Sequence, residues 1–242
     1  MLLMLNLLAA CGSLKDSPVT FNPHKTTSVK VREIPERHSV KTGETLYAIA
    51  WIYGQDFRQI AAWNRIEVPY MIRPGQLLRL KPEDLKIKIS SKKNLSEVRN
   101  PILLKATKAM PQEANSNAIA MQWHWPVQGA VVRSFSAEVD KKKGITIKGE
   151  MGQVVVAAAA GQVVYSGHGL LGYGNLVIVK HDEHYLSAYA YNSVLIVKEG
   201  DNVSQGQAIA RMGLGEHHVP LLYFEIRYQG EALDPVKLLP RN

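Results

Sequence analysis

The spacing of apolar and polar positions changes along the chain and divides it into two structured parts. Between residues 38 and 80, apolar side chains recur at helical spacing, at Leu46, Ile49, Ala50 and Tyr53. Farther along, short β-rich runs at 153–158, 161–165, 175–180 and 185–191 are separated by glycines. Such runs predict antiparallel hairpins. The chain therefore predicts a multidomain protein, with a small α+β domain followed by a mostly-β domain of antiparallel sheet.

Residues 37–81 predict the order strand, helix, helix, strand. A strand at 38–40 and a turn at 41–44 precede Thr45, a residue type favoured at a helix N-cap. Gly54 ends this helix, and a second helix runs from about Asp56 to Asn64. Pro74 and Gly75 then form a turn before a strand at 76–80. The expected product is a compact βααβ module.

This module resembles the LysM domain along its whole length. The matching segments read VKTGETL at 40–46, WN at 63–64 and IRPGQ at 72–76. LysM domains bind glycans that contain N-acetylglucosamine, in a groove between the first loop and the loop before the last strand. The resemblance implies a glycan-binding groove formed by Gly43, Glu44, Thr45 and Leu46 facing Pro69, Tyr70, Met71 and Ile72. A second interpretation stays open for Leu46 and Ile72, in which they belong to the core.

Residues 123–242 resemble the LytM, or M23-type, zinc endopeptidases, which cut peptidoglycan cross-bridges. The matching segments include GQVVYSG at 161–167, GYGNLVIVKH at 172–181 and FEIR at 224–227. The resemblance implies the duplicated hybrid motif fold of that family, built on antiparallel sheet. In these enzymes His-x-x-x-Asp, Tyr-x-His and His-x-His-Phe-Glu motifs supply the metal ligands and the catalytic histidines.

The positions of these three motifs hold other residues here. They read KKGIT at 142–146, YAY at 189–191 and LLYFE at 221–225. Zinc takes imidazole, thiolate or carboxylate ligands, and a catalytic site needs three of them plus an open position. Lysine, threonine and tyrosine do not meet this need. We therefore expect no metal cofactor, no catalytic residues and no peptidase activity.

An intact fold would turn the former metal site into a groove. Its expected lining is Lys142, Thr146, Tyr191, Leu221 and Tyr223, with Arg133, Tyr173 and Arg227 as rim contacts. An apolar and aromatic lining with one cation suits a peptide that carries a leucine or aromatic anchor and a carboxylate. The simpler alternative is that these side chains pack against each other without binding anything.

Other histidines could restore a metal site only if they converged. Residues 181–184 read HDEH, and His217 and His218 precede the third motif. Adjacent residues of an extended chain point to opposite faces, so at most one of His217 and His218 could enter a shared site. We expect these histidines to be exposed turn residues.

The remaining segments predict an anchor and two connectors. Residues 1–11 end in LAAC, which resembles the lipobox of bacterial lipoprotein signals, with Cys11 as the lipidated residue. The apolar run is far below the roughly 20 residues that span a bilayer and fits a signal h-region better. It lacks the positively charged n-region of such signals, so a short buried segment stays open as the alternative. Gly12, in place of aspartate, implies sorting to the outer membrane by resemblance to enterobacterial lipoproteins. Residues 12–36 predict a flexible tether, and residues 82–122 a basic linker.

The net charge of +8 favours anionic partners such as cell-wall polymers or acidic lipid. No nucleic-acid-binding motif accompanies this charge, so nucleic acid is not an expected partner.

A lipobox, one LysM domain and an emptied LytM domain, in this order, are similar to the NlpD/EnvC class of degenerate LytM proteins. Members of this class activate N-acetylmuramyl-L-alanine amidases by binding a helix that otherwise blocks the amidase zinc site. The resemblance implies a lipid-anchored periplasmic activator on the outer membrane, enriched at the septum, that promotes septal peptidoglycan splitting and cell separation. Two alternatives stay open: a zinc endopeptidase with unrecognised ligands, and a passive tether that only binds peptidoglycan.

Overall fold

The computed structural model describes residues 33–83, 121–138 and 142–241. Cys11, the tether as far as residue 32 and the linker residues 84–120 lie outside these ranges, so the expectations for them remain predictions. Within the described ranges, no helix is both long enough and apolar enough to cross a membrane.

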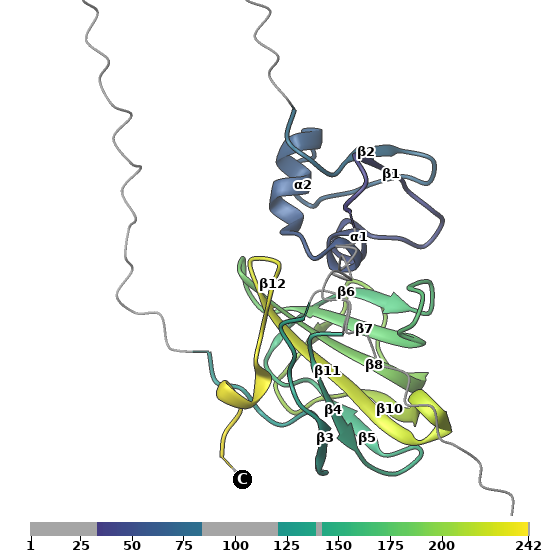
Figure 1. Ribbon diagram of the computed structural model, residues 1–242, viewed down its shortest axis with the longest axis vertical. Coiled ribbons are helices and arrows are strands. Elements are labelled where there is room, and N and C mark those ends of the chain that lie inside the picture. The colour runs from purple at the N-terminus through teal and green to yellow at the C-terminus, as the bar shows by residue number, and fades with distance from the viewer. Residues whose placement is uncertain (1–32, 84–120, 139–141, 242) are drawn as a thin grey trace, which may run out of the picture. The chain divides into compact units, whose positions relative to one another are not determined.

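The N-terminal domain has the predicted βααβ order (Figure 1). Its elements are β1 (Arg37–Ser39), α1 (Leu46–Tyr53), α2 (Phe57–Asn64) and β2 (Leu77–Arg79). Strands β1 and β2 pair in antiparallel fashion, with His38 opposite Leu78. The buried side chains between the strands and helices include Val40, Ile49, Ile60, Leu78 and Leu80.

Capping residues place the ends of both helices where the sequence predicts them. Thr45 Oγ1 accepts a hydrogen bond from the Ala48 amide at 3.1 Å, and Gly54 ends α1 in the left-handed conformation with φ of 62°. This conformation favours glycine because a side chain there is strained. Asp56 accepts from the Arg58 amide at 2.9 Å and so caps α2. The predicted boundaries of both helices are confirmed.

The C-terminal domain is one antiparallel sheet. Its strands in the described ranges are β3 (Val131–Arg133), β4 (Ile145–Lys148), β5 (Val154–Val156), β6 (Gly161–Gly167), β7 (Asn175–Lys180), β8 (Tyr185–Leu195), β9 (Asn202–Val203), β10 (Ala208–Leu214), β11 (Pro220–Tyr228) and β12 (Glu231–Leu233). The short 3-10 helices η1 (Glu216–His218) and η2 (Pro235–Lys237) flank β11 and β12. The mostly-β antiparallel fold is confirmed.

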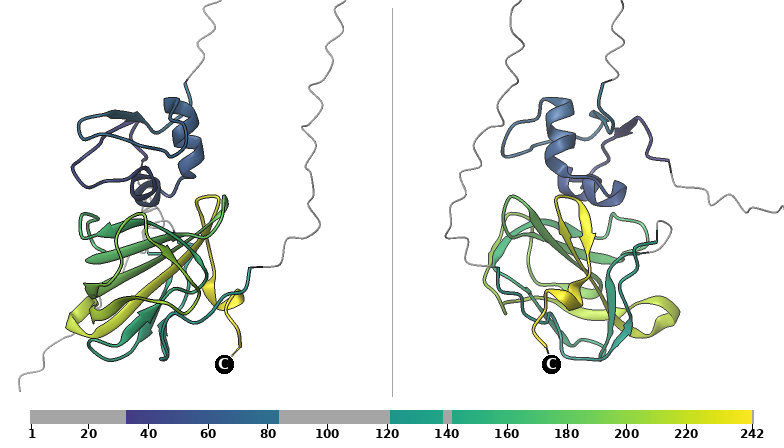
Figure 2. Two further views of the ribbon diagram at one scale, coloured as in Figure 1. Left: turned by 180° about the vertical axis from the view of Figure 1, so that it is seen from behind. Right: turned by 60° about the vertical axis from the view of Figure 1, so that its left-hand side comes forward.

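The main path through the sheet is β3-β4-β11-β10-β8-β7-β6-β9, with β5 on β10 and β12 on β11. Strand β8 pairs with β11 through its first half and with β10 through its second half. Figure 2 shows that the sheet is strongly twisted and curves back on itself. The four predicted runs are all strands, and β4, β10 and β11 are strands that the apolar pattern alone did not indicate.

Strand β11 lies between β4 and β8 and separates two sets of side chains. Side chains alternate between the faces of a strand. One row enters the buried core and consists of Leu222, Phe224 and Ile226. The opposite row consists of Leu221, Tyr223, Glu225 and Arg227. This second row carries the residues expected at the emptied metal site.

Gly144 allows the segment before β4 to approach β11 closely. A Cβ atom on Gly144 would lie 2.3 Å from the Phe224 carbonyl oxygen and 2.9 Å from Cζ of Tyr223. The backbone of β11 cannot move aside without disturbing its strand pairing. We therefore expect Gly144→Ala to lower the free energy of unfolding by about 2 kcal/mol. Urea unfolding followed by circular dichroism measures this effect.

Gly169→Ala is the matched control for this substitution. A Cβ there meets only the Tyr165 hydroxyl, at 3.2 Å. We expect a much smaller loss of stability in this variant, and equal losses in the two variants would contradict the close approach at Gly144.

Candidate functional site

The three emptied motifs meet where β8 leaves β11. Tyr223 on β11 lies opposite Thr146 on β4 and opposite Ala190 on β8. The next residue, Tyr191, has φ of 67°, which is rare for an aromatic residue. Beyond it, β8 pairs with β10 instead, with Asn192 opposite Met212. The break interrupts strict alternation along β8, and the Tyr191 ring lies 6.2 Å from the Tyr223 ring.

The Lys142 ammonium is inserted among the aromatic rings of this cluster. Lys142 Nζ donates hydrogen bonds to the Tyr191 hydroxyl and to the Gly172 carbonyl oxygen. Nζ also lies 5.1 Å, 4.5 Å and 5.7 Å from the ring centres of Tyr173, Tyr191 and Tyr223. These separations are typical of cation–π attraction, which is stronger where water is excluded. Burial lowers the pKa of Lys142, while the Glu216 carboxylate partly opposes that shift.

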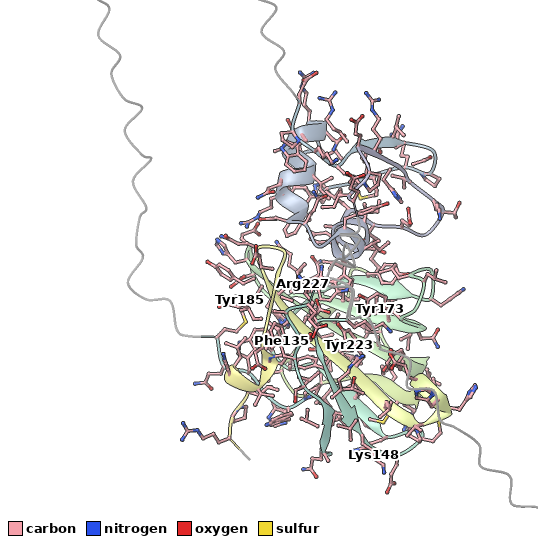
Figure 3. All side chains as sticks on the ribbon, in the orientation of Figure 1. Phe135, Lys148, Tyr173, Tyr185, Tyr223 and Arg227 are labelled. Atoms are coloured by element: carbon pink, nitrogen blue, oxygen red, sulfur yellow. The ribbon has the colours of Figure 1, made fainter. Side chains whose placement is uncertain are left out.

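Tyr223 belongs to a buried chain of polar groups. Its hydroxyl donates to the Glu225 carboxylate and accepts from the Gly144 amide at 2.9 Å. Arg227 Nε donates to Glu225 Oε1 at 2.6 Å. Burial, together with the Glu225 charge, raises the pKa of Tyr223 far above its ordinary value. Figure 3 shows Tyr173 and Tyr223 side by side, with Arg227 farther along β11.

A pocket of about 280 Å³ lies beside this cluster, and we call it the η1 pocket. Its lining combines apolar side chains with charges of both signs. The lining residues are Val132, Arg133, Thr146, Lys148, Tyr191, Glu216, His217, Val219 and Leu221.

Glu216 is the one carboxylate among the described residues that line the η1 pocket. Its Oε1 atom accepts a hydrogen bond from the Tyr191 hydroxyl at 3.1 Å. The same atom lies 3.6 Å from Arg133 Nη1 and 4.0 Å from Lys142 Nζ. Glu216 was not predicted from the sequence, because it belongs to none of the three motifs. The turn between β10 and β11 carries Glu216 and brings it to the η1 pocket.

The η1 pocket coincides with only part of the predicted groove. Thr146, Tyr191 and Leu221 line the η1 pocket, but Lys142, Tyr223 and Arg227 do not. Lys142 and Tyr223 are engaged in the contacts described above. Arg227 is six positions from Leu221 along β11, roughly 20 Å in extended chain. The η1 pocket also differs from the predicted groove in charge, because it is lined by two cations, Arg133 and Lys148, and by the Glu216 carboxylate.

The expectation for the histidines is met only in part. His217 and His218 are exposed in η1, as expected, but both have φ of 57° and are not extended. His181 is not an exposed turn residue: its Nδ1 lies 2.8 Å from the Ala160 carbonyl oxygen and its Nε2 lies 2.7 Å from Ser187 Oγ. Burial lowers the pKa of His181 to about 4. The His181 ring thus contributes to the structure of the C-terminal domain through these two contacts.

Contacts of Glu44 with Lys41 and His38 hold the first loop of the predicted glycan groove in place. The Glu44 carboxylate accepts from the Lys41 amide at 2.8 Å and lies 2.7 Å from His38 Nε2. Gly43 has φ of 80°, and Thr45 caps α1. Leu46 is 1% exposed, so its placement in the groove is wrong and its placement in the core is right.

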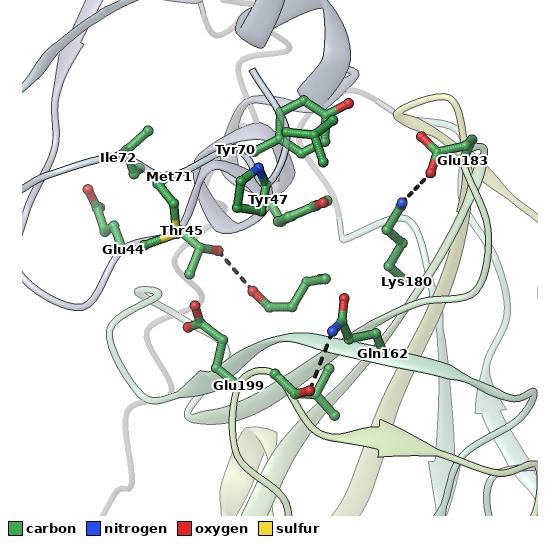
Figure 4. Close-up of a pocket in the computed structure, with 15 residues that line it drawn as sticks. Glu44, Thr45, Tyr47, Tyr70, Met71, Ile72, Gln162, Lys180, Glu183 and Glu199 are labelled. Atoms are coloured by element: carbon green, nitrogen blue, oxygen red, sulfur yellow. Dashed lines mark hydrogen bonds and ion pairs between the residues drawn. The ribbon is translucent and has the colours of Figure 1, made fainter. Parts of the chain in front are cut away.

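The second loop of this groove leaves apolar surface accessible. Tyr70 packs edge-on against Tyr47 and Phe57, with ring centres 6.1 Å and 5.3 Å apart. Met71 is 75% exposed and Ile72 is half-buried. Figure 4 shows Glu44 and Thr45 near Met71 and Ile72.

Comparison with known proteins matches both domains and most of the chain. Residues 38–81 match the LysM domain, and residues 140–235 match peptidase family M23. The lipoprotein NlpD/LppB homolog of Pseudomonas aeruginosa is 36% identical, over 98% of this chain and 89% of its own. The chain belongs to the NlpD family of lipoproteins. The family resemblance expected from the sequence is thereby confirmed.

Other NlpD-family relatives carry names that describe a role or a location. The murein hydrolase activator NlpD of Escherichia coli is 32% identical, over 85% of this chain and 68% of its own. The outer membrane antigenic lipoprotein B of Haemophilus influenzae is 33% identical, over 85% of this chain and 64% of its own. Among solved structures, the hexagonal crystal form of Helicobacter pylori Csd3 has a TM-score of 0.45 and 24% identity, covering 50% of this chain and 34% of that one.

Peptidase family M23 implies zinc, and this NlpD-family chain does not offer suitable ligands at the motif positions. Lys142 donates its protons to neighbouring oxygens and has no lone pair to offer. Burial raises the pKa of Tyr191 and of Tyr223, so both phenols stay protonated. In the part of the chain that is described, no group of three or more His, Cys, Asp or Glu side chains could hold a metal ion. The residues present do not fit the group, and no reaction step through zinc follows from them.

Proposed function

We propose that this protein is a non-catalytic activator of a periplasmic N-acetylmuramyl-L-alanine amidase. Its LysM domain holds peptidoglycan, and its η1 pocket binds the segment of the amidase that keeps that enzyme inactive. One observation carries the proposal: a lysine ammonium and tyrosine rings fill the positions of the metal motifs, while an accessible pocket lies directly beside them.

The mechanism needs only a difference in affinity between two states of the amidase. An activator shifts an equilibrium by as much as it prefers the active state. A hundredfold preference corresponds to about 2.7 kcal/mol. Burial of one leucine-sized side chain contributes about 1.5 to 3 kcal/mol. One apolar anchor against Val132, Val219 and Leu221 is therefore sufficient.

The proposal places the protein on the periplasmic face of the outer membrane. Cys11 ends a lipobox-like sequence, and relatives over most of the chain are named lipoproteins. Lipid chains on Cys11 would hold the protein at the membrane, since each buried methylene contributes about 0.8 kcal/mol. The LysM domain would then reach the cell wall, where septal splitting during cell separation is the proposed outcome.

For the LysM domain we propose that Tyr70, Met71 and Ile72 receive the apolar faces of sugar rings. Glu44 and Thr45 of the first loop lie near the same surface (Figure 4), and we assign Gly43 of that loop to it as well. The exposure of Met71 in a loop otherwise packed by Tyr70 supports this assignment. Leu46 contributes only through the core.

Dye release from labelled murein sacculi tests the proposed function. The protein from residue 12 onward, an amidase, and the two together are compared, with and without added zinc. We expect the combination to release dye well above the amidase alone, and the protein alone to release none. Met71→Asp is expected to reduce cosedimentation with sacculi, while Val154→Asp, at an exposed apolar residue of β5, leaves it unchanged.

Two other outcomes of the dye-release assay would each support one of the alternative functions. Zinc-dependent release by this protein alone would indicate an endopeptidase with unrecognised ligands. Binding to sacculi without stimulation of any amidase would indicate a passive tether.

A further inference from the structure

The η1 pocket contains hydrogen-bond donors that lack acceptors. Thr146 is 4% exposed and lines the pocket, yet its Oγ1 has no hydrogen-bond partner. Arg133 lines the same pocket, and its buried Nε and Nη2 atoms have none either. Buried polar atoms in proteins are nearly always paired, so such a group requires an explanation. Three unpaired donor atoms at one pocket are suited to an acceptor that comes from outside the chain.

The charge around these donors favours an anion. Arg133 and Lys148 line the pocket, and the Lys142 ammonium lies 4.5 Å from the ring centre of Tyr191, which also lines it. The Arg133 guanidinium is held 5.6 Å above the Tyr223 ring centre, which fixes its position. A planar guanidinium with free N–H groups matches a carboxylate, to which it can donate two parallel hydrogen bonds.

Glu216 supplies a carboxylate here, but it fits poorly. Its closest approach to Arg133 is 3.6 Å, whereas a charged hydrogen bond of this kind is typically about 2.7 to 2.9 Å long. Its side chain is 53% exposed, so solvent screens the pair. It is carried by η1, whose two histidines adopt left-handed backbone conformations. Glu216 thus pairs only weakly with Arg133 and leaves Nε and Nη2 of Arg133 unpaired, while its hydrogen bond comes from the Tyr191 hydroxyl at 3.1 Å.

We propose that the η1 pocket binds a carboxylate side chain of a protein partner, with an adjacent apolar residue, and that Glu216 is the chain's own stand-in for it. The incoming carboxylate pairs with Arg133 and accepts from the Thr146 hydroxyl, while Glu216 moves toward solvent. The apolar neighbour packs on Val132, Val219 and Leu221. Assignment of this segment to an amidase rests on the proposed function, but the preference for a carboxylate does not.

Two blocked tripeptides, acetyl-Leu-Glu-Leu-amide and acetyl-Leu-Gln-Leu-amide, test the preference. Binding to the full chain is measured by NMR titration of wild type, Glu216→Gln and Arg133→Gln. We expect wild type to bind the Glu peptide about tenfold more tightly than the Gln peptide. Glu216→Gln removes the competing charge, so it is expected to raise affinity for the Glu peptide about fivefold and to leave the Gln peptide unaffected. Arg133→Gln is expected to abolish the discrimination.

Glu150→Gln is the matched control, because it removes the same charge from an exposed residue outside the η1 pocket. We expect it to behave as wild type. Equal affinity for the two peptides, binding of neither at millimolar concentration, or weaker binding of the Glu peptide by Glu216→Gln would each overturn the proposal.

The same variants in the dye-release assay separate this inference from the proposed function. Discrimination between the peptides without stimulation of any amidase would refute the activator role and leave the carboxylate pocket standing. Stimulation by a protein that does not discriminate would refute the carboxylate pocket and leave the activator role standing.

Discussion

Replacement of Leu221 by aspartate is expected to lower amidase stimulation about a hundredfold while leaving binding to sacculi unchanged. Leu221 supplies apolar lining to the η1 pocket, which also contains the Glu216 carboxylate. Aspartate would remove the apolar contact and place a second negative charge there. Loss of one buried leucine-sized contact costs about 1.5 to 3 kcal/mol, and about 2.7 kcal/mol corresponds to a hundredfold change. Dose–response curves of dye release against activator concentration measure the shift.

Val154→Asp serves as the control for the introduced charge. Val154 is an exposed residue of β5 and does not line the η1 pocket. Thermal melts of both variants show whether the domain remains folded, and Leu221→Ala provides a milder change at the same position. Full stimulation by a folded Leu221→Asp protein would exclude the η1 pocket as the amidase-binding surface.

Acidification from pH 7 to pH 4 is expected to lower the free energy of unfolding of the C-terminal domain by about 3 kcal/mol, through His181. Burial lowers the pKa of His181 to about 4 in the folded protein, against an ordinary value near 6.5. Between these values the unfolded chain binds a proton that the folded chain does not. Stability is therefore complete above about pH 6.5 and is lost as the pH falls toward 4, with one pKa unit equivalent to about 1.4 kcal/mol.

Urea unfolding at pH 7, 5.5 and 4.5 measures this dependence. His181→Gln loses the bonds to Ala160 and Ser187, so it is expected to be less stable at pH 7 but to have a flatter pH profile. His168→Gln changes an exposed histidine and should keep the wild-type profile. Parallel profiles for wild type and His181→Gln would show that other groups cause the acid sensitivity.

Local chemistry determined the helices and several strands of this protein. Thr45, Gly54 and Asp56 form caps through contacts with residues at most four positions away, so their roles are visible in a short stretch of sequence. The strands β6 and β7 likewise coincide with apolar runs between glycines. The absence of any zinc-ligand type at 142–146, and of histidine at 221–225, is also a property of the sequence alone, because residue chemistry does not depend on the fold.

Strand β11 shows why the apolar pattern missed other strands. Leu222, Phe224 and Ile226 enter one core, while Tyr223 and Glu225 are also buried on the opposite side. A strand that is buried on both faces loses the alternation that marks a half-buried strand. Its place in the sheet is set by pairing with β4 and β8, which are distant in sequence.

Only the tertiary structure decided which of the motif residues are accessible. The sequence by itself determined that the metal motifs are lost and that a LysM domain precedes them. It could not show that the Lys142 ammonium lies among the tyrosine rings, or that Glu216 reaches Arg133 from the turn between β10 and β11. These contacts join segments far apart along the chain, at the point where β8 changes its pairing partner next to Tyr191. Which part of the site is open follows from the strand register, because the register decides which residues lie next to each other on neighbouring strands. No local sequence pattern encodes that register.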